Sequence, residues 1–253
     1  MNQELAGKTV LITGASRGIG AATALTLASA GASHVVLHYN SFQEGAEKTA
    51  AELRGKGVEA TLIQADLSQS AGIESLAEHV RSMQRLDILI NNAGHLVQRA
   101  KLAEFTEDLF DRVNNLNVKS VYFITQAAAP GMIERGSGVV INVSSIAARN
   151  GGGPGATIYA AAKASVAAIT KGLAKELAPK GIRVNAVSPG TVDNYFHEKY
   201  SNRDILNAML AQTPAGTLGT NEEVADTILF LCTSPSRYIH GQTIEINGGM
   251  YMV

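Results

Sequence analysis

Seven short apolar segments alternate with longer segments of helical pattern along the 253-residue chain. Several of the short segments are apolar almost throughout, which is typical of strands buried on both faces of a parallel sheet. Parallel neighbours need a crossover connection, and the intervening helices supply it. The sequence therefore predicts a doubly wound α/β sheet with helices on both faces. The expected strands are Thr9–Thr13, His34–Tyr39, Ala60–Gln64, Leu86–Ile90, Val139–Val143, Arg183–Ser188 and Thr243–Ile246.

No internal repeat and no linker-like stretch interrupts this alternation, so we expect a single domain over residues 1–253. Region 190–217 is too long for an ordinary connection between a strand and a helix. Segments of that length in compact domains often form lids or binding loops, so we expect this one to hold the substrate.

Two pairs of residues match the capping box that starts many helices, in which a hydroxyl is followed three residues later by Glu. They are Ser41 with Glu44 and Thr220 with Glu223. We expect a helix to begin directly after each hydroxyl residue.

Composition narrows the class of protein further. Hydrophobic residues make up 45% of the chain and charged residues 17%, against about 25% charged in an average domain, which excludes disorder. A net charge of −1 offers no electrostatic reason to bind nucleic acid or an anionic membrane. No apolar run approaches the roughly 20 residues of a membrane span, and no secretory signal is recognisable. We therefore expect neither a nucleic-acid nor a membrane partner.

Cysteine and histidine usage point to a reducing compartment and away from metal chemistry. Cys232 is the only cysteine, so no internal disulfide can form, and we expect a cytoplasmic protein. His34 and His38 are the only histidines at a ligand-like spacing, and they lie at opposite ends of one expected strand. We therefore expect no metal site.

The first expected strand runs directly into the glycine-rich segment 13–20 and then into an Ala- and Leu-rich helix. A dinucleotide needs a tight turn, a backbone free of β-carbons and a helix N-terminus for its pyrophosphate. The alternative is that the glycines simply permit a turn. The strand-turn-helix setting favours a dinucleotide cradle, whose candidate cofactor contacts are Gly14, Ser16, Arg17, Gly18, Ile19 and Gly20.

The end of the second expected strand indicates which dinucleotide binds. NAD sites usually carry an acid there for the ribose 2′-hydroxyl, whereas this chain reads His-Tyr-Asn-Ser at 38–41. Arg17 can offer a cation to a 2′-phosphate, with Asn40 and Ser41 as hydrogen-bond donors. We therefore predict NADP(H). The alternative is a solvated Arg17 with Tyr39 stacked on the adenine, and we count Tyr39 among the cofactor contacts.

Tyr159 and Lys163 are four residues apart at the start of a helical run, which puts both on one face. A cation close to a phenol lowers its pKa from about 10, and a shift of three units corresponds to about 4 kcal/mol. Such a pair suits acid–base work on a carbonyl or alcohol, although at this spacing it usually marks a solvated face. Here it follows the strand that ends in Ser144-Ser145, whose hydroxyls can bond an oxyanion.

Six motifs follow one another along nearly the whole chain. They are the glycine pattern at 13–20, Asn91-Asn92-Ala93-Gly94, Asn117 in Leu-Asn-Val, Ser144-Ser145, Tyr159 and Lys163 in Tyr-x-x-x-Lys, and Pro189-Gly190. In this order they resemble the short-chain dehydrogenase/reductase family, in particular its 3-oxoacyl-carrier-protein reductases and bacterial sugar and alcohol dehydrogenases. The resemblance implies a single-domain Rossmann-type sheet in the strand order 3-2-1-4-5-6-7. It also implies a homotetramer.

The resemblance assigns catalytic roles to four residues. It implies that Tyr159 exchanges a proton with the substrate oxygen and that Ser145 holds that oxygen. Lys163 would lower the pKa of Tyr159 and bond the nicotinamide ribose, and Asn117 would support a water chain to Lys163. The implied contacts with the cofactor, beyond the glycine loop and residues 39–41, are Asp66, Leu67, Asn92, Ala93, Gly94, Tyr159, Lys163, Pro189, Gly190 and Val192.

The implied activity is NADP(H)-dependent interconversion of a ketone and a secondary alcohol on a small molecule. A 3-oxoacyl or carbonyl reductase is the first expectation and a sugar or polyol dehydrogenase the alternative. A carrier-protein substrate would need basic residues at the site mouth, for which the candidates are Arg135, Lys180, Lys199 and Arg203. A sugar would need polar residues in the lid, such as Asp193, Asn194, His197 and Glu198. A non-catalytic NADP(H) sensor could lose Ser145, Tyr159 or Lys163, and all three are present.

Overall fold

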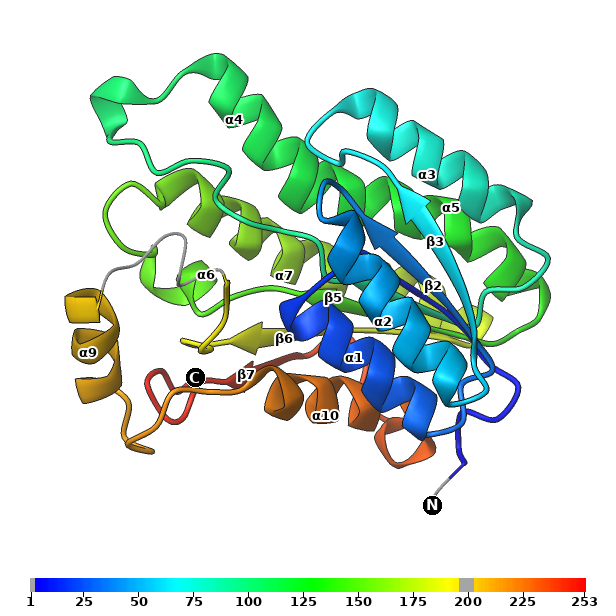
Figure 1. Cartoon of the computed structure of the whole chain (residues 1–253). Helices are drawn as coiled ribbons and strands as arrows, with labels where there is room; N and C mark the ends of the chain where they lie inside the picture. Colours follow the sequence, from blue (N-terminus) through cyan, green and yellow to red (C-terminus); the bar gives the residue numbers. More distant parts are fainter. Residues whose placement is uncertain (1–2, 196–202) are drawn as a thin grey trace.

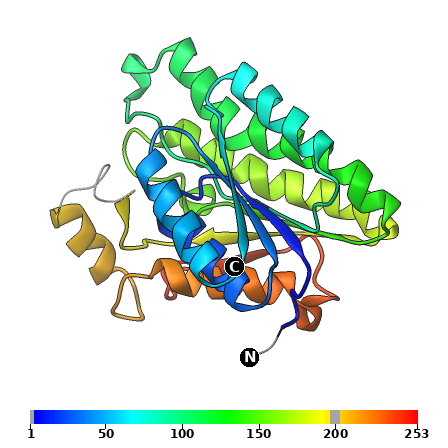
Figure 2. The same cartoon turned by 45° about the vertical axis from the view of Figure 1, so that its right-hand side comes forward.

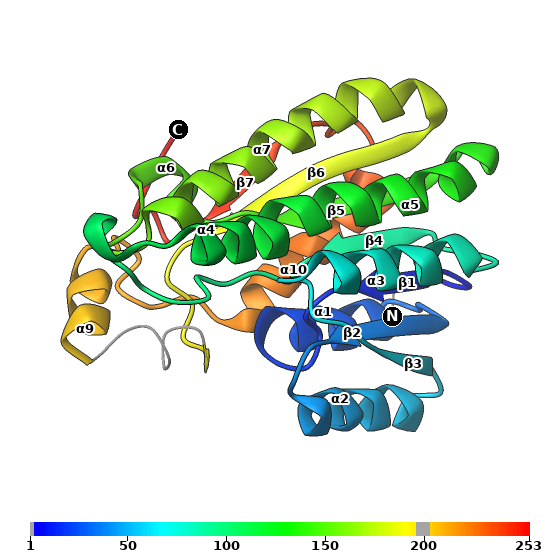
Figure 3. The same cartoon turned by 90° about the horizontal axis from the view of Figure 1, so that it is seen from above.

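Seven parallel strands form one sheet in the computed structural model, which describes residues 3–195 and 203–253, with only the backbone of residue 203. The strand order is β3-β2-β1-β4-β5-β6-β7, and Figure 3 shows the strands side by side from above. This order confirms the predicted doubly wound sheet. The strands are β1 Thr9–Ile12, β2 His34–Tyr39, β3 Glu59–Gln64, β4 Ile88–Asn91, β5 Gly138–Val143, β6 Ile182–Pro189 and β7 Thr243–Ile246.

Central strands are apolar because both of their faces are covered. All four residues of β1 are buried, and Ile12 pairs with Leu37 of β2 on one side and with Ile90 of β4 on the other. A strand enclosed in this way has no solvent-facing positions, so the run needs no polar alternation. The sequence signal used to predict the strands therefore has a direct structural cause.

Helices cover the two faces as separate layers, which Figures 1 and 2 show on opposite sides of the strands. One face is packed by α1 (Gly18–Ser29), α2 (Gln43–Gly55) and α10 (Asn221–Cys232). The other is packed by α3 (Ser70–Ser82), α5 (Ser120–Glu134) and α7 (Thr157–Leu177). The shorter helices are α4 (Glu107–Asn114), α6 (Ala147–Asn150), α9 (Arg203–Ala211), a π-helix η2 (Asn115–Lys119), and the 3-10 turns η1 (Leu102–Glu104), η3 (Ala178–Lys180) and η4 (Ser234–Ser236).

One of the two predicted capping boxes is correct and the other is wrong. Thr220 caps α10, because its hydroxyl accepts from Glu223 N at 3.2 Å while the Glu223 carboxylate accepts from Thr220 N at 2.8 Å. At α2 the capping residue is Phe42, without a side-chain bond. The helix begins one residue later than the Ser41 pattern predicts.

The expected substrate region 190–217 is partly ordered by backbone pairing and a helix. Val192 forms a parallel bridge with Gly219, and α9 lies within the region, beside the end of β6 in Figure 1. His197, Glu198 and Lys199 lie outside the described residues. Within the described part of the chain, no helix combines the length and apolar character needed to cross a bilayer.

Candidate active site

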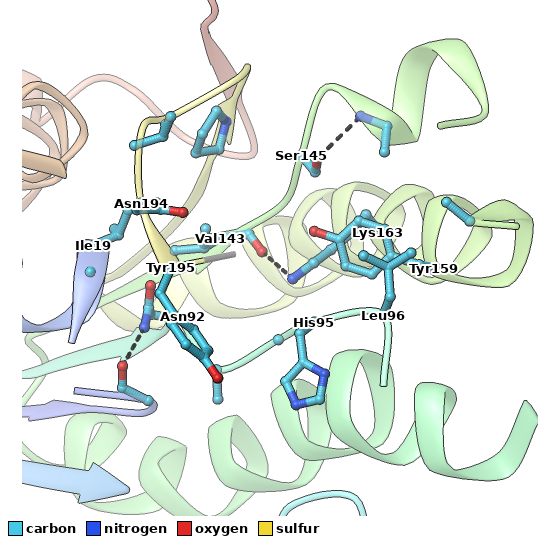
Figure 4. Close-up of a pocket in the computed structure, with 18 of the residues that line it drawn as sticks. Ile19, Asn92, His95, Leu96, Val143, Ser145, Tyr159, Lys163, Asn194 and Tyr195 are labelled. Atoms are coloured by element: carbon cyan, nitrogen blue, oxygen red, sulfur yellow. Dashed lines mark hydrogen bonds between the residues drawn. The ribbon is translucent and has the colours of Figure 1, made fainter. Parts of the chain in front are cut away.

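A cavity of about 720 Å³ lies where the strands end, along the carboxyl edge of the sheet. Its walls come from the segments that follow β1, β2, β3, β4, β5 and β6, together with α9 and the start of α7. Open α/β sheets place their ligands at this edge. Figure 4 shows side chains from these segments converging on one space.

The glycine loop between β1 and α1 forms one wall of the cavity. Gly14 has a φ of +66°, a conformation that side chains strongly disfavour. A Cβ on Gly20 would collide with the carbonyl oxygen of Gly14. All six candidate residues of the loop, Gly14, Ser16, Arg17, Gly18, Ile19 and Gly20, line the cavity. They leave open backbone at the start of α1, as a phosphate would require.

Hydrogen bonds lock the glycine loop to the segment that follows β4. Asn92 Nδ2 donates to the carbonyl oxygens of Thr13 at 2.8 Å and Gly14 at 3.0 Å, and Figure 4 marks one bond from this side chain. The Thr13 hydroxyl accepts from the backbone N–H groups of Asn92 and Ala93. The two segments are therefore positioned as one unit, and Asn92, Ala93 and Gly94 all line the cavity as predicted.

His38 also holds the glycine loop, a role that sequence reasoning missed. Its Nδ1 accepts from Gly14 N at 3.1 Å, and its Nε2 bonds to Ala65 O at 3.0 Å. A carbonyl can only accept, so Nε2 carries the proton and the ring is neutral. Burial lowers the pKa of His38 to about 4 and keeps it in that form. Gly14 lies 24 residues away in sequence, and no local pattern signals the contact.

The adenine-side candidates are confirmed as cavity residues with one exception. Asn40 and Ser41 line the cavity together with Asp66 and Leu67, and Asn40 Nδ2 donates to the Asp66 carboxylate at 3.4 Å. Tyr39 does not line the cavity, because it is still part of β2 and is only 7% exposed. The alternative in which Tyr39 stacks on an adenine therefore has no support in this geometry. Phe42, three residues later, lines the cavity instead.

Ser145, Tyr159 and Lys163 meet at the end of β5 (Figure 4). Lys163 is 2% exposed, and its Nζ donates to Val143 O at 2.8 Å. The same Nζ lies 5.7 Å from the centroid of the Tyr159 ring. The neighbouring Ser144 is turned inward, where its hydroxyl donates to Lys163 O. Ser145, and not Ser144, is therefore the hydroxyl placed beside Tyr159.

Burial sets the protonation of this group. It raises the pKa of Tyr159 to about 12, against a smaller lowering by the hydrogen bond with Ser145. It lowers the pKa of Lys163 to about 8. Desolvation of the phenolate is the largest influence on the pKa of Tyr159, while the Lys163 ammonium is bonded to Val143 O. Tyr159 therefore keeps its proton at neutral pH. A lowering of the pKa of Tyr159 by Lys163 stays a prediction.

Asn117 lies behind the cavity wall, on the π-helix η2. It is fully buried, and its Nδ2 donates to the carbonyl oxygens of His95 at 3.0 Å and Val113 at 2.9 Å. Its Oδ1 has no hydrogen-bond partner within the described structure. A Cβ added to Gly94 would lie 2.6 Å from both Asn117 Oδ1 and Lys163 Nζ. Gly94 therefore packs between Asn117 and Lys163, and a larger residue there would collide with both side chains.

The segment after β6 closes the cavity from the opposite side. Pro189, Gly190 and Val192 line it as predicted. A Cβ on Gly190 would lie 2.7 Å from the Asn247 side chain, so the position requires glycine. Asn194 also lines the cavity, and its Nδ2 donates to Asn221 Oδ1 at 3.1 Å.

Outside the glycine loop and the group around Tyr159, the cavity lining includes many apolar side chains, which no motif in the sequence indicated. They include Leu96, Val97, Ile146, Ala156, Ile205, Met209 and Met250, and polar lining residues include His95, Arg99, Arg112, Asn150 and Gln212. His95 lines the cavity, and its Nδ1 accepts from Val97 N at 2.8 Å. In residues 3–195 and 203–253, no group of three His, Cys, Asp or Glu side chains could hold a metal ion.

The expected basic rim is only partly placed near the cavity. Arg135 and Lys180 immediately precede β5 and β6, at the amino edge of the sheet, opposite the cavity. Arg135 donates to Leu86 O there. Their proposed place at the site mouth is therefore wrong. Lys199 and the side chain of Arg203 lie outside the described structure.

Comparisons with known proteins agree over nearly the full length. A sequence model of a family described as enoyl-(acyl carrier protein) reductase matches residues 14–251. A 3-oxoacyl-(acyl-carrier-protein) reductase FabG of Staphylococcus aureus is 39% identical over 97% of this chain and 98% of the relative. A 3-oxoacyl-(acyl-carrier-protein) reductase of Synechocystis is 40% identical over 98% of each chain. A solved structure from Beutenbergia cavernae, described as a putative NAD(P)-dependent gluconate 5-dehydrogenase with bound NADP at low occupancy, superposes with a TM-score of 0.91. It is 32% identical and covers 99% of each chain.

Proposed function

The chain belongs to the short-chain dehydrogenase/reductase family, and on that premise we propose that it is an NADP(H)-dependent oxidoreductase that interconverts a ketone and a secondary alcohol. One observation carries the proposal. A dinucleotide cradle and the group Ser145, Tyr159 and Lys163 open into the same cavity. We place this activity in a single cytoplasmic domain.

The residues present fit NADP(H). A Cβ at Gly20 would fill the turn on which a pyrophosphate would lie, and the start of α1 attracts anions. The Arg17 guanidinium makes no hydrogen bond or ion pair within residues 3–195 and 203–253, so its donors remain available. No acid ends β2, where an NAD enzyme would bind the ribose hydroxyls. Asn40 and Ser41 would flank the 2′-phosphate, with Asp66 and Leu67 at the adenine.

The cofactor, when bound, supplies or accepts the hydride, and the protein handles the accompanying proton. Because Tyr159 is protonated at neutral pH, its hydroxyl can donate to the oxygen of a ketone as that oxygen gains negative charge. The Ser145 hydroxyl would donate a second hydrogen bond to the same oxygen. Lys163, held by Val143 O, would stabilise the phenolate that remains after proton transfer.

The apolar side chains of the cavity lining favour a ketone with an aliphatic or aromatic substituent. Leu96, Ile146 and Met209 offer no partners for a run of hydroxyl groups. We propose a 3-oxoacyl or carbonyl reductase activity, the class named for the bacterial relatives at 39–40% identity. Oxidation of a sugar acid is the second candidate, because His95, Arg99 and Gln212 could bind a hydroxyl and a carboxylate. The structurally similar protein from Beutenbergia cavernae is described as a putative gluconate dehydrogenase.

NADPH consumption tests the substrate class, measured with β-ketoacyl thioesters, aryl ketones and diketones, alongside NADP+ reduction with aldonates and polyols. We expect turnover of the apolar ketones to exceed turnover of the sugar compounds. The reverse order would move the assignment to the second candidate. No turnover with any class, despite tight NADPH binding, would favour a cofactor sensor.

Replacing Tyr159 with Phe tests the mechanism. The change removes only the hydroxyl, so we expect kcat to fall by at least about a thousandfold, the range that a positioned proton donor contributes, while NADPH affinity stays within about twofold. The measurement is steady-state turnover of the best ketone together with NADPH binding by fluorescence. Retention of most of the activity would contradict the role of Tyr159.

A further inference from the structure

The guanidinium of Arg17 contacts two aromatic rings that come from different parts of the chain. Its Cζ is 3.9 Å from the centroid of the Phe42 ring and 4.0 Å from the centroid of the Tyr195 ring. Phe42 precedes α2, and Tyr195 lies in the expected substrate region 190–217, which follows β6. Tyr195 lines the cavity, and Figure 4 shows it among the side chains drawn there. Three separate segments therefore meet at one cation.

The Arg17 Cζ lies over both rings at the distance of a cation–π contact, and rings in such contact stack on a guanidinium face and leave its edge open. All five N–H donors of a guanidinium lie in its plane, so stacking does not use them. Within the described residues, Arg17 makes no side-chain hydrogen bond and no ion pair. Arg17 also lines the cavity. The arrangement is an oriented cation whose donors are all available to an anion in the cavity.

Phe42 is held in place by the packing of the glycine loop on α2. A Cβ added to Gly45 would overlap the ring of Phe42 and the carbonyl oxygen of Ser16. Gly45 therefore lets the ring and the loop pack in direct contact.

Tyr195 is placed by contacts of the residues immediately before it. Asp193 N donates to Gly219 O at 2.9 Å, and Asn194 Nδ2 donates to Asn221 Oδ1 at 3.1 Å. A Cβ on Gly18 would lie 3.6 Å from Asn221 Oδ1, so the glycine loop runs directly beneath these contacts. The start of the lid is thus fixed above the loop that would hold the pyrophosphate.

We propose that Phe42 and Tyr195 are positioning residues for Arg17 and that they make the start of the substrate lid part of the site that selects a ribose 2′-phosphate. The rings fix the plane of the guanidinium, so its edge meets a phosphate without first having to be ordered. NADH lacks that phosphate and gains nothing from the orientation. The inference rests on the proposed function, because it requires NADP(H) to bind with its 2′-phosphate near Arg17.

A role limited to the lid would have a different signature. If Tyr195 contacted only the substrate, its loss would raise the substrate KM and leave binding of both cofactors unchanged. If it only stabilised the fold, its loss would weaken NADPH and NADH equally. A selective loss of NADPH affinity is expected only from an action through Arg17.

The test measures the dissociation constants of NADPH and NADH by fluorescence, with no substrate present. We compare the wild type with Tyr195→Ala, Tyr195→Phe and Phe42→Leu. Loss of one cation–π contact is expected to weaken NADPH about three- to tenfold in Tyr195→Ala and Phe42→Leu, with less than a twofold change for NADH. Tyr195→Phe keeps the ring and should bind like the wild type. Tyr238→Ala, which removes a tyrosine that is 97% exposed and outside the cavity, is the matched control.

The same titrations in an Arg17→Ala background separate the possible outcomes. Tyr195→Ala should then have no further effect on NADPH, because the two changes act through one cation. An equal loss for both cofactors, or an undiminished loss in the Arg17→Ala background, would overturn the positioning role. A wild type that binds NADH as tightly as NADPH would instead contradict the cofactor assignment of the proposed function. Thermal unfolding midpoints show whether each variant is folded.

Discussion

At the scale of single residues, the site depends on glycines and buried polar groups that hold others in place. Gly94 separates Asn117 from Lys163, and His38 holds the peptide of Gly14. Neither Gly94 nor His38 is assigned a part in the transfer of a proton. Replacing either residue should nevertheless disturb the site. Gly94 lies against Lys163, and His38 is bonded to the glycine loop.

Replacing Gly94 with Ala should displace Lys163. The new Cβ would lie 2.6 Å from Lys163 Nζ, so the ammonium must leave Val143 O. We expect kcat to fall about 10- to 100-fold, as for other displacements of about an ångström. Gly172→Ala is the matched control, since its Cβ would meet open space on the exposed side of α7. It should remain active and gain about 0.5–1 kcal/mol of stability. Full activity of Gly94→Ala would contradict this account of Lys163.

His38 should make stability depend on pH in a defined direction. Its pKa is about 4 in the folded protein against 6.5 for the free side chain, so the unfolded chain binds the proton more tightly. The associated stability is fully present above pH 6.5, falls as the pH drops toward 4, and amounts to about 3 kcal/mol. Urea unfolding at pH 7.5, 5.5 and 4.5 measures this loss. His38→Asn should lose less stability than the wild type over the same range, and an identical slope in both proteins would refute the assignment.

At the scale of elements, helix starts show which local signals can be read from sequence. The capping box of α10 uses only Thr220 and Glu223, which are neighbours on one helix turn, and it forms as predicted. At the start of α2, Phe42 and the distant glycine loop both pack at Gly45, and no side chain caps the helix, so the Ser41 pattern misplaced that start. A local signal succeeds where the interaction itself is local.

Replacing Thr220 with Ala removes the hydroxyl that caps α10 and should lower the free energy of unfolding by about 1 kcal/mol. α10 packs against α1, so the loss should appear in the global transition measured by urea. Thr220→Ser keeps the hydroxyl and should retain most of the stability. Equal losses in the two variants would indicate that the methyl group, and not the cap, is responsible.

At the scale of the whole molecule, we propose that the chain assembles as a homotetramer. Several large apolar side chains on α4 and α5 are exposed in the single chain, namely Phe110, Tyr122, Phe123 and Ile133. Exposed apolar groups of this size on neighbouring helices favour an interface between subunits. The low proportion of charged residues agrees with surface hidden in an assembly.

Light scattering measures the assembly directly. We expect a mass about four times that of the 26.5 kDa chain. Phe123→Asp would place a charge in the proposed interface, and it should lower the measured mass. A monomeric wild type at micromolar concentration would exclude the tetramer.

The glycine loop and the Tyr159 and Lys163 pair can be recognised in the amino-acid sequence, and the resemblance to a known family predicts the strand order. These features depend on spacing along one segment, or on motifs in a set order. The folded structure is needed to see that Tyr39 is buried while Phe42 reaches the cavity, that His38 supports Gly14, and that burial raises the pKa of Tyr159. These burials, contacts and pKa shifts depend on which distant residues the fold brings together and on how completely it excludes water. A pattern of neighbouring residues specifies neither.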